Sequence, residues 1–103
     1  MNETETLEQL IRQLFCCDTV HTQSVTIHQN IKKGGSSWDG VVEVFSLHNY
    51  PKTQTAYAWN YADKLGDHQY VVVLAIPPIV TALDAVRAHV AGKILPFSLE
   101  RSN

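Results

Sequence analysis

Apolar side chains recur at two different spacings along this chain, and the first spacing predicts two helices. Near the N-terminus they repeat every three or four positions, as on one side of an amphipathic helix: Leu7, Leu10, Ile11, Leu14 and Phe15. Thr6 followed by Gln9 can form a capping box, so we expect this helix to begin at Thr6 and to end near Cys17.

The second helix follows a pair of prolines. Its apolar positions have the same helical spacing: Ile79, Leu83, Val86 and Val90. Thr81 can cap the N-terminus together with Asp84 three residues later, and Gly92 is a typical left-handed residue at the C-terminus. We therefore expect the helix to lie between Thr81 and Gly92.

Four further segments have the composition and spacing of strands. Residues 24–31 alternate apolar and polar side chains, which predicts an outer strand with one face in water. The next strand is expected to begin at about Trp38 or Val41 and to end at Leu47, with Val42 and Val44 on one face and Phe45 on the other. Residues 55–62 form the third predicted strand.

The most apolar segment spans residues 70–76 and ends at Pro77 and Pro78. It is too short for a buried helix, and its valines favour a strand. Because polar residues do not alternate with the apolar ones, we expect both faces to be covered and the strand to lie in the interior of a sheet. Pairing should stop by Ile76, since proline has no N–H to donate.

These elements predict one α+β domain over residues 1–103, in the order helix, four strands, helix. We expect a mainly antiparallel sheet of four strands, or five if the C-terminal tail joins it, with both helices on one face. The other face then needs a cover. A second copy of the chain can supply it, or the tail of residues 93–103, in which Leu95, Phe97 and Leu99 have strand spacing.

Composition favours self-association. Charged residues are 17% of the 103, below the roughly 25% usual in globular domains, while hydrophobic residues reach 45%. A net charge of −2 gives no basic field, which argues against nucleic acid as a partner. The N-terminus resembles no signal peptide and no apolar run could span a bilayer, so we expect a cytoplasmic protein with reduced thiols at the adjacent Cys16 and Cys17.

No motif in the sequence indicates a cofactor or a metal. The five histidines are scattered, and the one local cluster, Cys16 and Cys17 with His21, matches no zinc-binding spacing. Residues 32–37 have the composition of a phosphate-binding loop but lack its spacing, so a solvated hairpin loop is the better interpretation.

The segment at residues 55–62 separates its side chains by size. Tyr57, Trp59 and Tyr61 point to one face, and small side chains point to the other. This aromatic stripe is either core beneath the helices or the wall of a pocket for an apolar or cationic small molecule. In the second interpretation Trp38 and Tyr50 line the rim.

Glu43 is an acid inside an otherwise apolar strand. With His28 or His48 nearby it could act as a proton acceptor in a small hydrolase. The alternative is a carboxylate at the strand rim or paired with a lysine.

Three stretches resemble a known set of sequences: Trp38-Asp39-Gly40-Val41-Val42-Glu43-Val44-Phe45, Tyr50-Pro51-Lys52 and Ala56-Tyr57-Ala58-Trp59. They are similar to small uncharacterised bacterial proteins found in environmental DNA and on mobile integron gene cassettes. The resemblance covers about half the chain. It implies bacterial origin, a compact α+β domain and oligomerisation, and it implies no activity or site.

The sequence thus supports three functional hypotheses. The first is a non-enzymatic, homo-oligomeric interaction or binding module whose interface includes Leu95, Phe97 and Leu99. The second is a small-molecule binding protein that uses the aromatic stripe. The third is a hydrolase-like enzyme that uses Glu43 and a histidine.

Overall fold

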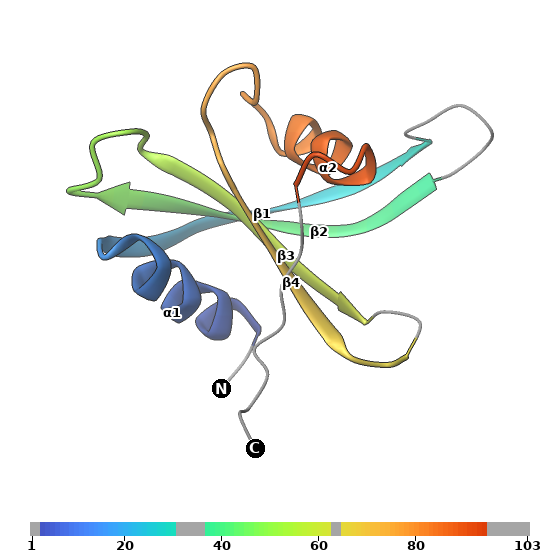
Figure 1. The fold of residues 1–103 in the computed structure, drawn as a ribbon, viewed down its shortest axis with the longest axis horizontal. Coiled ribbons are helices and arrows are strands. Elements are labelled where there is room, and N and C mark those ends of the chain that lie inside the picture. Colours follow the sequence, from blue (N-terminus) through green and yellow to red (C-terminus); the bar gives the residue numbers. More distant parts are fainter. Residues whose placement is uncertain (1–2, 31–36, 63–64, 95–103) are drawn as a thin grey trace.

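A four-stranded antiparallel sheet lies between two helices in the computed structural model, which describes residues 3–30, 37–62 and 65–94 (Figure 1). The elements in chain order are α1 (Glu3–Phe15), β1 (Asp18–Asn30), β2 (Ser37–His48), β3 (Thr55–Ala62), β4 (His68–Leu74) and α2 (Ala82–Val90). Each strand pairs with the next along the chain, so the order in space is β1-β2-β3-β4. The predicted α+β class, the element order and the antiparallel four-stranded sheet are confirmed.

The helices lie on opposite faces of the sheet, so the prediction that both cover one face is wrong. α1 packs Leu7 and Ile11 against a core cluster that contains Phe45. α2 packs Val86 against a separate cluster that contains Val44. Because consecutive residues of a strand point to opposite faces, Val44 and Phe45 mark the two sides of β2. The central strands are apolar on both faces, and each helix covers one of the two faces.

β3 has small side chains on one face and aromatic side chains on the other, and a different helix packs on each face. Ala56 and Ala58 are fully buried on the α1 side, where their small side chains leave room for α1. Tyr57 and Trp59 are buried on the α2 side. The alanine face of β3 therefore packs on the side of α1, and its aromatic face packs on the side of α2.

β4 is an edge strand, whereas the sequence pattern predicted a strand in the interior of the sheet. Within residues 3–30, 37–62 and 65–94, it pairs with β3 alone. Val71 and Val73 are buried on the α2 side, and Val72 is half-buried on the α1 side. Coverage of both faces by helix layers makes a strand apolar on both sides without giving it two neighbouring strands. As predicted, the strand ends before Pro77.

The boundary between α1 and β1 also differs from the prediction. α1 already includes Glu3, so Thr6 lies inside the helix and does not cap it. After α1, Cys16 has a positive φ of 53° and β1 begins at Asp18, well before the predicted start at Ser24. A β-bulge in β1 interrupts the alternation of side chains and explains why the sequence pattern missed the first half of the strand.

Both ends of α2 follow the prediction. The Asp84 amide donates to Thr81 Oγ1 over 3.1 Å and the Thr81 amide donates to Asp84 Oδ2 over 3.2 Å, which completes a capping box. At the other end Gly92 has a φ of 81°, and the Lys93 amide donates to the Ala88 carbonyl over 2.9 Å. This is the Schellman arrangement that glycine favours.

The two hairpins separate beyond Glu43. β2 and β3 pair from Ser46 opposite Thr55 to Glu43 opposite Ala58, whereas β1 and β2 pair along almost their full length. Figure 1 shows the β1–β2 and β3–β4 hairpins diverging from this region. Glu43 therefore lies where the sheet divides.

Candidate functional site

The predicted aromatic stripe is part of the core beneath α2. Tyr57 is 7% exposed and Trp59 is 2% exposed, while Tyr61 is half-buried. The Tyr57 hydroxyl donates to the Val80 carbonyl over 3.2 Å, and the ring centroid of His89 lies 5.7 Å from those of both Trp59 and Tyr61. Burial, followed by the nearby Asp84 charge, raises the pKa of Tyr57 above its ordinary value. The packing favours the core interpretation, and ligand binding by the stripe stays a prediction.

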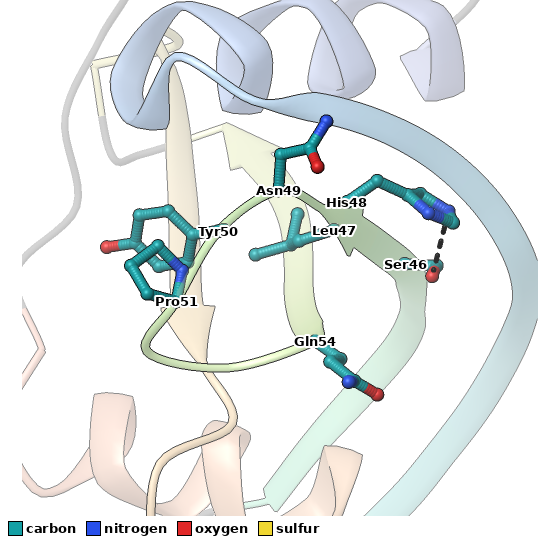
Figure 2. Close-up of a pocket in the computed structure, with 7 residues that line it drawn as sticks. All are labelled: Ser46, Leu47, His48, Asn49, Tyr50, Pro51 and Gln54. Atoms are coloured by element: carbon teal, nitrogen blue, oxygen red, sulfur yellow. Dashed lines mark hydrogen bonds between the residues drawn. The ribbon is translucent and has the colours of Figure 1, made fainter.

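Tyr50 does not join the stripe. Its ring lies 5.3 Å from that of Phe15, and it packs against the core on the α1 side. It lines a hollow of about 490 Å³ at the end of β2 and the connection to β3, together with Leu47 and His48 (Figure 2). None of the three stripe residues lines this hollow. Trp38 lies near the start of β2, and its backbone is opposite Gln29 in β1.

Two segments named in the sequence predictions lie outside the described residues. The C-terminal interface residues Leu95, Phe97 and Leu99 are in one of them, and most of the loop of residues 32–37 is in the other. Docking of the tail on the sheet or on a second copy therefore stays a prediction.

A polar cluster that the sequence did not predict as a set forms around Glu43 on the α1 side of the sheet. Glu43 Oε1 lies 2.7 Å from His21 Nε2 and 2.5 Å from Ser24 Oγ, and the latter two atoms are 3.5 Å apart. Since a carboxylate only accepts hydrogen bonds, the imidazole N–H and the serine O–H both donate to the same oxygen. The side chains of His21 and Glu43 are 30% and 17% exposed.

The bulge in β1 brings this cluster together. His21 lies opposite Phe45 and Gln23 lies opposite Val44, so Thr22 has no partner residue in β2. In a regular strand, residues three apart point to opposite faces. The extra residue moves Ser24 onto the face of His21, and both then reach Glu43. The Thr22 hydroxyl donates to the Val44 carbonyl over 3.1 Å and holds the bulge against β2.

Neither histidine that was predicted near Glu43 reaches it. His28 pairs with Asp39 further along the same hairpin, in a pair that is largely exposed. His48 is 3.4 Å from Ser46 Oγ near the end of β2. The sequence signal that could have identified His21 is weak, because it depends on the position of a bulge. Glu43 itself was recognisable as the one acid in an apolar strand.

Metal ligands do not converge in the part of the chain that the structure describes. No group of three or more His, Cys, Asp or Glu side chains could hold a metal ion there. Both cysteines are free; Cys16 is exposed and Cys17 is buried next to Thr19. Cys16, Cys17 and His21, which are close in the sequence, therefore form no such group among the described residues.

The outer edge of β4 is the second candidate site. Among the described residues, β4 pairs on one side only. Its seven residues include no Lys, Arg, Asp, Glu or Pro, the residues with which proteins usually block pairing at a sheet edge. The other edge strand, β1, has a bulge and polar side chains along its length. β4 is therefore the less protected edge.

In comparisons with known proteins, no family model, no curated protein and no solved structure matches the chain. The similarity to integron-cassette proteins stays a prediction. Within the described ranges, no helix has the length and apolar character needed to cross a membrane.

Proposed function

We propose that this protein acts as an interaction module that assembles with copies of itself along the outer edge of β4. The supporting observation is an apolar strand without blocking residues at the edge of the sheet. An edge strand presents a row of unpaired backbone N–H and C=O groups, which a second strand can satisfy. Antiparallel pairing of two copies would join two four-stranded sheets into one continuous sheet.

The sequence of β4 suits pairing with itself. A two-fold axis at Val72 places Val72 opposite Val72 of the second copy, Tyr70 opposite Leu74, and Val71 opposite Val73. Every pair is apolar, and each side chain stays on the face it already occupies. Directly opposed apolar pairs stabilise a sheet by roughly 0.2–1 kcal/mol each. The low charged fraction of 17% is in keeping with a surface used for association.

A charge at the two-fold axis tests this register. In Val72→Lys two ammonium groups would face each other, so we expect a monomer in sedimentation velocity at micromolar concentration, where we expect the wild type to be a dimer. Val72→Glu should behave in the same way. An equimolar mixture of the two variants should associate again, because Lys and Glu then lie opposite each other.

Val41→Lys is the matched control. Val41 is 44% exposed on β2, away from the β4 edge, so the same substitution there should leave the oligomer unchanged. Circular dichroism checks that each variant is folded. A monomeric wild type, or a Val72→Lys chain that still self-associates, would overturn the proposal.

A variant truncated after Ile94 distinguishes assembly through β4 from assembly through the C-terminal tail. It lacks Leu95, Phe97 and Leu99, and we expect it to remain oligomeric. If it becomes monomeric while Val72→Lys does not, the tail forms the interface and assembly along β4 is wrong.

A further inference from the structure

We propose that Ser24, Glu43 and His21 form a reactive serine site that accepts an acyl group from a small activated ester. This chemistry goes beyond self-assembly and does not depend on it. The three residues lie on β1 and β2, while the proposed interface is the outer edge of β4 at the opposite side of the sheet.

Hydrogen-bond directions make Ser24 the nucleophile. Its hydroxyl donates to Glu43 Oε1 over 2.5 Å, so the serine proton already points at a base and the oxygen lone pairs remain available for attack. Ser24 is exposed, which lets a substrate reach Oγ. The carboxylate is largely shielded from water, where a charge-assisted hydrogen bond is stronger than at an open surface.

His21 is a positioning residue in this arrangement. In a Ser-His-Asp triad the acid binds Nδ1 and the serine binds Nε2, so the imidazole is the base. Here Glu43 and Ser24 both lie near Nε2. The imidazole N–H therefore holds the carboxylate in place from one side while Ser24 approaches from the other. The His21 ring is itself held against Phe45, at a centroid distance of 5.3 Å.

The reaction balances with these groups and an ester. Ser24 Oγ forms a bond to the acyl carbon, and the bond from that carbon to the leaving oxygen breaks. Glu43 accepts the serine proton and returns it to the leaving oxygen, so an alcohol departs. Water can then attack the acyl-serine with Glu43 again as the base, which releases the acid and restores Ser24.

The substrate class follows from the open setting of the cluster. Ser24 is on a sheet surface and Glu43 is at the point where the hairpins separate. A small acyl group with a good leaving group suits such a surface, because it needs no deep pocket. p-Nitrophenyl acetate is the probe of this class.

The experiment follows p-nitrophenolate release by the full chain and locates the acetyl group by peptide mass spectrometry. We expect acetylation at Ser24. General bases contribute roughly 10²–10⁴-fold, so Ser24→Ala and Glu43→Gln should each lower the rate by about tenfold or more. His21→Gln should lower it less, and its glutamine amide can still donate to Glu43.

The chain provides matched controls for two of the three groups. Ser46 and His48 form a serine–histidine pair without a carboxylate, so Ser46→Ala should leave the rate unchanged. Asp39→Asn removes the carboxylate of the exposed His28 pair and should also have no effect. An unchanged rate in Ser24→Ala, or acetyl groups confined to lysines and the N-terminus, would overturn the proposal even if Glu43→Gln failed to fold.

Discussion

Tyr57 shows how a single side chain joins the sheet to the segment that leads into α2. Its ring is buried beneath the helix, and its hydroxyl donates to the Val80 carbonyl just before the cap at Thr81. Burial and the Asp84 charge both disfavour the phenolate, so the pKa of Tyr57 is raised above 10.0. The folded protein therefore prefers a neutral tyrosine at this position.

Tyr57→Phe tests this contact at the residue scale. At neutral pH the variant should lose about 1 kcal/mol of unfolding free energy, the usual net value of one hydrogen bond. Because the folded pKa is above the unfolded one, the stabilisation by neutral Tyr57 is complete below pH 10.0 and is lost as the pH rises through the folded pKa. The variant should lose less stability than the wild type in that alkaline range.

Urea unfolding at neutral and alkaline pH measures both effects. Tyr61→Phe is the matched control, since Tyr61 is on the same face of β3 but half-buried. Equal alkaline losses in Tyr57→Phe and in the wild type would show that another group is responsible.

The polar cluster shows the limit of inference from single residues. Glu43 was recognisable in the sequence, because an acid in an apolar strand needs hydrogen-bond partners. The partners were not recognisable, because the pattern pointed to His28 or His48. Local alternation places His21 and Ser24 on opposite faces, and the bulge alone places them together.

Among the elements, α2 is the one whose ends are most fully encoded in local sequence. Asp84 accepts hydrogen bonds from the Val80 amide over 3.0 Å and from the Thr81 amide. These bonds, with the Val80 bond as the largest cause, lower the pKa of the Asp84 carboxyl below its ordinary value of 3.8. The cap is thus strongest when Asp84 is ionised.

Asp84→Asn should weaken the start of α2. Because the folded pKa is below the unfolded one, the carboxylate contributes stability above pH 3.8, and that contribution is lost as the pH falls through the folded pKa. The variant should be less stable than the wild type at neutral pH, and the difference should shrink on acidification. Thermal unfolding from neutral to acidic pH measures it. With Asp18→Asn as an exposed control, a difference that grows on acidification would contradict this account.

β4 shows that one apolar pattern is compatible with two positions in a sheet. A strand that is covered on both faces is apolar on both sides, whether it lies at the edge or in the interior of the sheet. The side chains depend on what covers the two faces, whereas the backbone hydrogen bonds depend on the neighbouring strands. The pattern therefore predicted correctly that both faces of β4 are covered, and predicted incorrectly that β4 has a neighbouring strand on each side.

At the scale of the whole molecule, the two edges of the sheet have different properties. β1 is long, polar and bulged, while β4 is short and apolar. An edge with a bulge and polar side chains is protected against pairing, and an apolar edge without them is not. The asymmetry predicts an assembly that closes after two copies, since pairing of β4 with itself leaves only β1 edges outside.

Hydrogen exchange should show this closed assembly. Every second amide of β4 points away from β3, and in the wild type these amides should exchange slowly because the second copy accepts from them. In Val72→Lys they should exchange rapidly, while the outward amides of β1 should exchange rapidly in both proteins. Equal β4 protection in the two proteins would place the second copy elsewhere.

The sequence pattern predicted the type and order of the elements, the bounds of β3, the caps of α2 and a mainly antiparallel sheet. These features depend on contacts between residues close in the chain, which local periodicity and capping residues encode. The local pattern did not predict which face each helix covers, that β4 lies at an edge, or that His21 and Ser24 meet at Glu43. Those outcomes depend on strand register and layer packing between distant segments, which the local pattern does not specify.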